Sequence, residues 1–240
     1  MDKKEFIEKL TDKTQKINCE LNEEQQEKFY KYMNLLLEWN EKMNLTAITD
    51  PVEVIRKHFI DSLTILKYIK ENDKIADIGT GAGFPGIPIK IANKNIDITL
   101  VDSLNKRVNF LNEVIKKIDL KAINAIHDRA EEFGKNKEYR ENYDVAVSRA
   151  VARMNILVEY MLPTVKVGGT CICMKGPEVQ EEINEAKSAI NILGGKIDEV
   201  FEFSLPDSDL KRTIIVIKKV KNTPSKFPRK AGIPAKNPLK

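Results

Sequence analysis

Short apolar runs alternate with longer amphipathic segments from Lys74 onward, as strands alternate with helices. In the amphipathic segments apolar residues recur at helical spacing, for example Leu104, Val108, Leu111 and Ile115. Because the runs are nearly continuously apolar, the strands should be buried on both faces, which predicts a doubly wound α/β fold with a mainly parallel sheet. The predicted strands are KIADIG (74–79), DITLVD (97–102), AINAIH (122–127), YDVAVS (143–148), TCICMK (170–175), VFEFSL (200–205) and RTIIVIK (212–218).

The last two predicted strands have no helix between them. Only the turn-forming residues 206–209, Pro-Asp-Ser-Asp, separate 200–205 from 212–218. Strands joined by such a short connection pair antiparallel. We therefore expect a seven-stranded, mostly parallel sheet that ends in an antiparallel hairpin.

The first 70 residues show helical periodicity. Asn22 followed by Gln25 has the pattern of a helix N-cap, and Asp50 followed by Pro51 marks a second helix start. We expect a helical extension over 1–70 packed on the core, an α/β domain over 71–219 and a basic, Pro-rich tail over 220–240.

The composition is typical of a globular protein that folds without disulfides. Of the 240 residues, 42% are apolar and 32% are charged. The longest stretch without a charged residue, Ile78 to Ile89, is about twelve residues, whereas a bilayer span needs ~20 apolar residues. The first residues alternate charged with apolar side chains, unlike a secretion signal. We expect a cytoplasmic protein that does not bind membranes.

Three cysteines, Cys19, Cys171 and Cys173, are too few and too scattered for a disulfide framework. Cys171 and Cys173 fall on one face of an apolar strand, without other metal ligands nearby in sequence. We expect buried thiols and no metal, with a metal site as the remote alternative.

Positive charge is concentrated at the C-terminal end. From Lys219 to Lys240 the chain has six Lys, one Arg and no acid, whereas the net charge of the whole chain is +4. Four prolines prevent a long helix or strand there, which favours an extended cationic arm that binds a polyanion. A solvated tail is the alternative. Phe227, Ile233 and Leu239 between the prolines favour a tail that packs on the body.

In a doubly wound sheet, ligands bind beyond the carboxyl ends of the strands. The first strand is followed by a Gly-rich loop, residues 77–86, in which glycines let the backbone approach a ligand. The second ends at Asp102, 21 residues beyond Gly81, the spacing at which a carboxylate accepts hydrogen bonds from the ribose of an adenosine cofactor. The third strand is followed by residues 127–131, His-Asp-Arg-Ala-Glu. The fourth strand is followed by residues 148–150, Ser-Arg-Ala.

The glycine spacing by itself fits two cofactors. Gly81, Gly83 and Gly86 satisfy the G-x-G-x-x-G fingerprint of dinucleotide sites, while Asp77 with Gly79, Gly81 and Gly83 satisfies the D-x-G-x-G-x-G loop of S-adenosylmethionine (SAM) enzymes. The acid that ends the first strand and the terminal hairpin favour SAM over NAD. An NAD-linked oxidoreductase remains the alternative.

Six ordered motifs resemble those of the glucose-inhibited division protein B family. They are HFIDSL, DIGTGAGFPGIPI, VDSLNKRVNFL, HDRAEE, DVAVSRAVA and PRKAGIPAKNPL, and the resemblance covers roughly residues 20–240. It implies a class I SAM-dependent methyltransferase fold, Rossmann-like, and transfer of a methyl group from SAM to N7 of one guanine in bacterial 16S ribosomal RNA (rRNA). S-adenosylhomocysteine would be the other product. A methyltransferase of another RNA and a non-catalytic RNA-binding assembly factor are the alternatives.

The resemblance also implies cofactor contacts. They fall on Gly79, Phe84, Ala130, Glu131 and Arg149. The spacing of the residues adds two further candidates: Gly81 in the Gly-rich loop, and Asp102, with Ser103 beside it, as the residue that binds the ribose. Phe84 could instead be a structural aromatic that closes the loop.

Guanine N7 has an in-plane lone pair and no proton, so methylation there needs no general base, and no catalytic residue is certain. Arg149 and Arg153 are candidates to face the reaction centre, because Arg is the usual partner of the guanine O6/N7 edge. His58 could line the mouth of the site together with Asp61 and Ser62. A solvated Arg153 and a structural His58 are the alternatives.

Lys175, Lys226, Arg229 and Lys230 are the RNA-binding candidates. Lys175 ends the fifth strand and could instead belong to a loop that enters the next helix. The others lie in the basic tail. The expected partner is 16S rRNA or the small ribosomal subunit, with no obligate protein partner.

Overall fold

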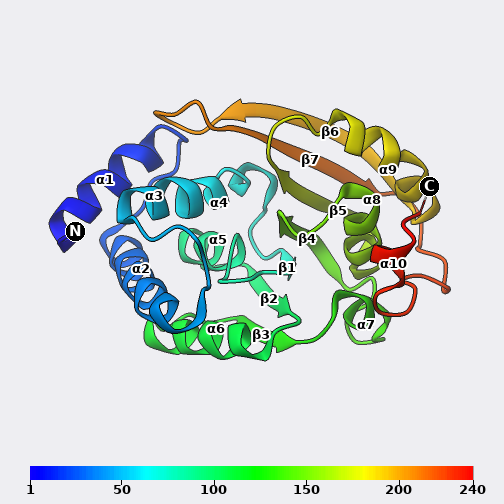
Figure 1. Cartoon of the computed structure of the whole chain (residues 1–240), viewed down its shortest axis with the longest axis horizontal. Helices are drawn as coiled ribbons and strands as arrows, with labels where there is room; N and C mark the ends of the chain where they lie inside the picture. Colours follow the sequence, from blue (N-terminus) through cyan, green and yellow to red (C-terminus); the bar gives the residue numbers. More distant parts are fainter. Residues whose placement is uncertain (240) are drawn as a thin grey trace.

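The computed structural model describes residues 1–239 and contains a seven-stranded sheet with the order β3-β2-β1-β4-β5-β7-β6 (Figure 1). Strands β1 to β5 pair in parallel, and β7 is antiparallel to both β5 and β6. The expected mostly parallel sheet with a terminal antiparallel hairpin is confirmed. The strands are β1 (Lys74–Ile78), β2 (Asp97–Asp102), β3 (Ile123–His127), β4 (Tyr143–Arg149), β5 (Val165–Lys175), β6 (Gly195–Ser204) and β7 (Lys211–Lys219).

The strand order reverses between β1 and β4, so the connections from these two strands leave toward opposite sides of the sheet. This is the switch point at which ligands bind in doubly wound folds. β1 and β4 are hydrogen-bonded neighbours, with Asp77 opposite Val147. The segments after β1 and β4 therefore face each other.

Two hydrophobic cores cover the two faces of the sheet. Successive side chains of a strand point to opposite faces, so Ile75 belongs to one core and its neighbour Ala76 to the other. The same alternation separates Val145 from Ala146 on β4. Burial on both faces explains why the inner strands are almost continuously apolar. The expectation fails at the two edges, because β3 is partly exposed and β6 is mostly exposed.

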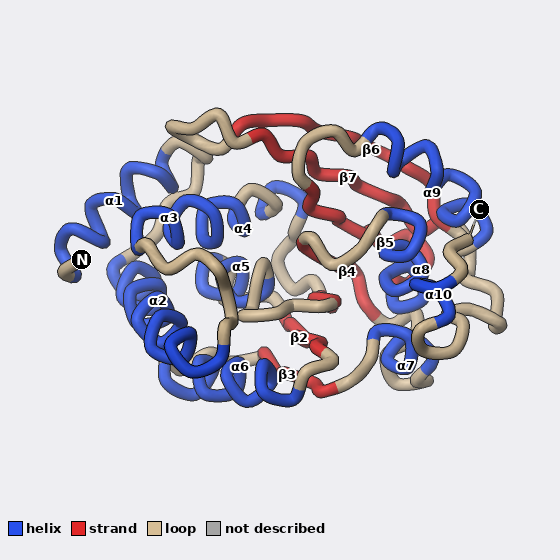
Figure 2. Tube along the Cα trace, viewed as in Figure 1, coloured by secondary structure: helices blue, strands red, loops and turns tan. Residues whose placement is uncertain are grey.

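The helices divide between these cores, and Figure 1 shows α1 to α6 on the left and α7 to α10 on the right. Figure 2 shows the strands running between the two groups. The longer helices are α1 (Lys3–Gln15), α2 (Glu23–Met43), α6 (Asn105–Lys117), α8 (Met154–Met161) and α9 (Gln180–Ile192). The shorter ones are α3 (Pro51–Val54), α4 (Asp61–Leu63), α5 (Gly86–Ala92), α7 (Ala130–Lys135) and α10 (Ile233–Lys236), with 3-10 turns at η2 (Leu66–Tyr68) and η3 (Leu162–Thr164).

The two helix starts expected near residues 22 and 50 are both present. Asn22 forms a capping box with Gln25, and the carboxylate of Asp50 accepts a hydrogen bond from the backbone N–H of Glu53. The second helix differs from a regular helix, because a π-helical segment η1 (Ile55–Ile60) joins α3 to α4. Such widened turns often occur at functional sites. His58 lies on this one.

The C-terminal segment after β7 packs back on the body of the protein. Phe227 and Leu239 contact the core beneath α8 and α9, whereas Ile233 is 40% exposed and is no anchor. The guanidinium of Arg140 donates hydrogen bonds to the backbone carbonyls of Thr223 and Phe227. The segment therefore has a fixed path along the surface.

Within residues 1–239, no helix is both long enough and apolar enough to cross a membrane. The same residues contain no group of three or more His, Cys, Asp or Glu side chains arranged to hold a metal ion. Cys171 and Cys173 are buried free thiols, and Cys19 is a partly buried one.

Candidate functional site

Two cavities open at the carboxyl ends of the parallel strands. Cavity A, of about 500 Å³, is lined by Asp102, Ser103, Asp128, Ala130, Glu131 and Gly232, among others. Cavity B, of about 440 Å³, is lined by Thr46, His58, Phe84, Met174, Lys175 and Arg212, among others. Both include Gly79, Arg149 and Ala150 in their walls, so the two cavities meet at the ends of β1 and β4.

Gly79 stands at this junction, where both the backbone conformation and a close neighbour favour a glycine. Its φ is +71°, a conformation that L side chains rarely adopt, and an added Cβ would lie 2.6 Å from a methyl carbon of Val151. Gly81 also has a positive φ, of +63°, but a Cβ there would have no heavy atom within 4 Å. Its backbone N–H donates to the carboxylate of Asp102 across 2.9 Å. That bond fastens the loop to the end of β2.

Asp77 is completely buried and holds the same loop by hydrogen bonds. Its Oδ2 accepts hydrogen bonds from the hydroxyl of Thr80 at 2.7 Å and from the backbone N–H of Gly86 at 2.8 Å. Its Oδ1 is buried and has no partner within the described chain. Burial raises the pKa of Asp77 to about 7, because the charged carboxylate loses its hydration. A positively charged ligand nearby would favour the ionised form.

Asp102 is 3% exposed and lines cavity A. Its two oxygens accept hydrogen bonds from the backbone N–H groups of Gly81 and Leu104, each at 2.9 Å. Because a carboxylate has about four acceptor positions, these bonds orient Asp102 and leave capacity for the hydroxyls of a ribose. Arg107 lies 3.4 Å away and balances the charge.

Ala130 and Glu131 line cavity A, at the start of α7. Oε1 of Glu131 accepts a hydrogen bond from the backbone N–H of Gly232 at 2.8 Å. Glu131 therefore holds the C-terminal segment, and Gly232 and Ala235 of that segment form part of the cavity wall. This contribution was not expected from the sequence, because no local pattern links residues about 100 positions apart.

The side chain of Arg149 is partly buried between the junction and η1. One of its nitrogens, Nη1, donates to the carbonyl of Lys57 at 3.1 Å and lies 3.4 Å from Asp61 Oδ2, while Nη2 lies 3.0 Å from Nδ1 of His58. Its guanidinium also stands 4.7 Å from the ring centre of Phe84. Burial lowers its pKa from the usual value, but a guanidinium stays protonated. Arg149 thus lines both cavities while its donors are largely engaged within the protein.

His58 lies in cavity B and stacks on Phe84, with ring centres 4.3 Å apart and an interplanar angle of 13°. Burial and the nearby Arg149 charge lower the pKa of His58 to about 3. The imidazole is therefore neutral at physiological pH. Phe84 and Gly81 line cavity B and not cavity A, so the loop contributes to both sides of the junction.

Arg153 and Lys175 differ in their placement. Arg153 lines neither cavity and forms an ion pair with Glu185 at 2.8 Å on the exposed surface. It therefore does not lie at the position expected for a residue that faces the reaction centre. Lys175 lines cavity B, where its ammonium donates to the carbonyl of Ala152 at 2.5 Å and to Glu182 at 2.7 Å. Lys175 is thus a buried, paired cation at the edge of the site.

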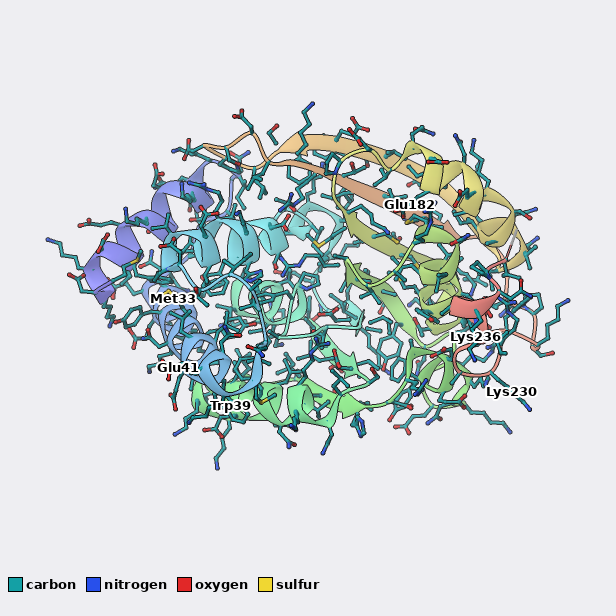
Figure 3. The ribbon with its side chains drawn as sticks, in the orientation of Figure 1. Met33, Trp39, Glu41, Glu182, Lys230 and Lys236 are labelled. Atoms are coloured by element: carbon teal, nitrogen blue, oxygen red, sulfur yellow. The ribbon has the colours of Figure 1, made fainter. Side chains whose placement is uncertain are left out.

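The three basic residues of the tail also differ from one another. Lys226 and Lys230 are exposed, whereas Arg229 binds the carboxylate of Glu159, which is completely buried, through contacts of 2.6–3.2 Å. Figure 3 shows Lys230 and Lys236 on the C-terminal segment, and Lys236 is the last residue of α10. The guanidinium of Arg229 is occupied by the protein, which leaves the two lysines as the accessible charges.

Two residues of cavity B were not expected from the sequence, Thr46 and Arg212. Thr46 lies in the loop between α2 and α3, and Arg212 lies at the start of β7 with its Nε 3.2 Å from both oxygens of Asp61. Neither lies in one of the motifs that carried the expected site residues.

Residues 25–214 match the family described as rRNA small subunit methyltransferase G, GidB. The chain belongs to this family. The protein named ribosomal RNA small subunit methyltransferase G of Alkaliphilus oremlandii is 53% identical over 96% of this chain and 98% of its own length. That of Desulforamulus reducens is 56% identical over 96% and 97%. The resemblance found in the sequence is thereby confirmed, and the chain is a SAM-dependent methyltransferase of small-subunit rRNA that modifies a guanine of 16S rRNA.

Solved structures show the same fold at low identity. A SAM-dependent methyltransferase from Aquifex aeolicus matches 74% of this chain and 97% of its own with a TM-score of 0.54 and 19% identity. M. jannaschii TYW2, solved in complex with AdoMet, matches 67% of this chain and 75% of its own with a TM-score of 0.53 and 14% identity. The residues of cavity A fit this cofactor. Gly79 has no side chain, so the cofactor can approach the loop backbone, and Asp102 retains acceptor capacity for the ribose of the cofactor.

Proposed function

We propose that this methyltransferase acts on N7 of its target guanine at the junction of the two cavities. The observation that carries the proposal is the shared wall of Gly79, Arg149 and Ala150. Methyl transfer requires donor and acceptor to lie in line at close range. Two cavities that meet at one point satisfy this requirement if SAM occupies cavity A and the guanine enters cavity B.

In this arrangement, Asp102 binds the ribose, Ala130 and Glu131 lie beside the adenine, and Gly79 lets the loop backbone meet the methionine part. Gly81 and Phe84 shape the loop from the side of cavity B. The bound SAM supplies an electrophilic methyl group on a sulfonium. The protein supplies alignment and a site from which water is largely excluded.

The neutral, buried His58 agrees with chemistry that needs no general base. Guanine N7 bears a lone pair and no proton, so no side chain has to remove one before the methyl group arrives. His58 and Arg149 then act by position, because both donate or accept within the walls of cavity B. We place the selection of the base in this cavity.

The RNA approaches over a surface whose accessible positive charge lies on the C-terminal segment, at exposed Lys226, Lys230 and Lys236. Three cations also line cavity B, but each is paired with a carboxylate: Lys57 with Glu53, Lys175 with Glu182 and Arg212 with Asp61. Basic side chains along a groove bind the phosphate backbone without reading its sequence. We propose that residues 220–239 are a fixed part of this RNA surface, that 1–70 form the wall facing the RNA, and that 71–219 form the methyltransferase domain.

The protein would act in the cytoplasm on 16S rRNA or on the small subunit, without an obligate protein partner. The test is nucleoside mass spectrometry on 16S rRNA from cells that lack the protein, after incubation with the pure protein and SAM. Stripped RNA and the intact particle are assayed separately. Formation of 7-methylguanosine supports the proposal, and the better substrate identifies the form that is recognised. A different methylated nucleoside, or none despite SAM binding, contradicts it.

The control for this assay is Gly79→Asp. The substitution adds a charged side chain at a positive φ and against Val151, so SAM binding and methylation should both be lost. Methylation that persists in this variant would show that the loop is not part of the cofactor site.

A further inference from the structure

A chain of hydrogen bonds leads from Arg149 through His58 to Thr46. Nη2 of Arg149 lies 3.0 Å from Nδ1 of His58, and Nε2 of His58 lies 2.8 Å from Oγ1 of Thr46. A guanidinium can only donate, so Nδ1 of His58 accepts. The single ring proton of the neutral imidazole then resides on Nε2. His58 therefore donates to the hydroxyl oxygen of Thr46.

That oxygen accepts a second hydrogen bond from the backbone N–H of Ile48 at 3.0 Å. A hydroxyl has two acceptor lone pairs and one donor proton, so both acceptor positions of Thr46 are filled. No described residue accepts the remaining proton of Oγ1. The backbone N–H of Thr46 is itself held by Asn40 at 2.8 Å, which fixes the residue. Thr46 thus offers one hydrogen-bond donor and no acceptor.

Thr46 lines cavity B, the same cavity that contains Phe84 and reaches the junction at Gly79. The position matters because guanine and adenine differ beside N7. Guanine has an acceptor, O6, next to N7, whereas adenine has the N6 amino donor there. An ordinary hydroxyl could rotate to serve either base. A hydroxyl whose lone pairs are already taken can serve guanine alone.

We propose that the hydroxyl of Thr46 donates a hydrogen bond to O6 of the target guanine and so selects guanine over adenine. This inference rests on the proposed function, in which cavity B receives the base. His58 and Arg149 act as positioning residues, because they fix which way the proton of Thr46 points. Arg149 would thus contribute to base selection without touching the base.

The experiment uses 16S rRNA assembled with one replaced nucleotide at the methylated position. The nucleotides are guanosine, inosine, which keeps O6, and 2-aminopurine riboside, which lacks it. The full-length wild type, Thr46→Ser and Thr46→Val are compared by kcat/KM for methyl transfer from SAM. Thr46→Ser keeps the hydroxyl, and Thr46→Val keeps the shape without it. Circular dichroism and SAM binding verify that each variant is folded and loaded.

We expect the wild type and Thr46→Ser to prefer guanosine over 2-aminopurine riboside by about 10-fold, the size of a hydrogen bond of roughly 1.4 kcal/mol. Inosine should behave like guanosine. Thr46→Val should lose activity on guanosine and change little on 2-aminopurine riboside, so its preference falls about 10-fold below that of the wild type. Comparing ratios cancels the intrinsic reactivity of each base.

A folded Thr46→Val that keeps the wild-type preference would overturn the inference. If that variant fails to fold, Thr46→Ala, which also lacks the hydroxyl, replaces it in the same comparison, and a preference equal to that of the wild type would again overturn the inference. A wild-type enzyme that makes no 7-methylguanosine from the unmodified RNA would instead contradict the proposed function.

Discussion

Arg149 at the end of β4 donates to the ring of His58 in η1 across 3.0 Å, although 91 positions separate the two residues. The bond joins the N-terminal helices to the switch point of the sheet. Asp61 reinforces it, because its carboxylate lies between Arg149 at 3.4 Å and Arg212 at 3.2 Å. The wall of cavity B therefore comes from three distant parts of the chain, held by charges that are largely buried.

Replacing Arg149 by Lys should lower both stability and activity. A lysine presents one ammonium in place of a planar fork and cannot reach the carbonyl of Lys57, Asp61 and His58 together. We expect unfolding in urea to show a loss of about 2–3 kcal/mol, the cost of leaving buried polar groups unpaired. Arg153→Lys is the matched control, and it should leave stability nearly unchanged, because its ion pair with Glu185 is exposed to solvent. Equal effects of the two substitutions would contradict this role for Arg149.

Asp77 should make stability fall as the pH rises. Burial raises its pKa to about 7 in the folded state, against 3.8 as the ordinary value. Between these two values the folded form binds the proton more tightly than the unfolded form, so stability is highest below about pH 4 and declines until about pH 7. Asp77→Asn should lack this decline. The measurement is the difference in unfolding free energy between wild type and variant from pH 4 to pH 8.

In this comparison the other titrating groups cancel, which isolates Asp77. The amide keeps an acceptor for Thr80 and Gly86 and places a donor where Oδ1 has no partner. We expect the variant to gain on the order of a few kcal/mol relative to the wild type as the pH rises from 4 to 8. A difference that does not vary with pH would show that Asp77 ionises normally.

Gly79→Ala should weaken SAM binding much more than Gly81→Ala. Both glycines have a positive φ, so both substitutions introduce backbone strain of about 1 kcal/mol. Only at Gly79 would the Cβ also meet a neighbour, Val151, at 2.6 Å. Isothermal titration calorimetry should show a loss of at least about 10-fold in affinity for Gly79→Ala, equivalent to roughly 1.4 kcal/mol, and less for Gly81→Ala. A larger loss of affinity for Gly81→Ala than for Gly79→Ala would contradict the placement of Gly79 at the cofactor site.

The three tail cations should separate into two classes. Arg229→Ala removes the guanidinium from the buried carboxylate of Glu159 and leaves it only the hydrogen bond from the backbone N–H of residue 229, so it should cost about 3 kcal/mol of stability. The double substitution Lys226→Ala and Lys230→Ala should leave stability unchanged and weaken RNA binding. Loss of two phosphate contacts should reduce the slope of log affinity against log salt by about 1.4.

Filter binding over a range of salt concentrations measures that slope, and thermal unfolding measures the stability. If the double variant has the same salt slope as the wild type, neither lysine contacts the RNA phosphates. A stable Arg229→Ala would show that the ion pair with Glu159 does not anchor the tail.

The order of strands and helices could be predicted because it depends on local pattern. Apolar runs such as 97–102 and helix starts such as Asn22 are visible in a few consecutive residues. The π-helical segment η1 was not predicted, since its apolar spacing also fits a regular α-helix. The exposure of Ile233 was not predicted either, because its sequence neighbours resemble those of the buried Phe227.

The sequence by itself determined the fold class, the cofactor and the family, because these are carried by residues that are close together, such as Asp77 and the glycines that follow it. Only the tertiary structure decided which cations are free, which residues complete the walls, and which groups contact the hydroxyl of Thr46. Those features depend on partners far apart in the chain, as in the pairs Arg149–His58 and Arg229–Glu159. The physical reason is that a buried polar group must find a partner in space, and sequence separation does not limit that choice.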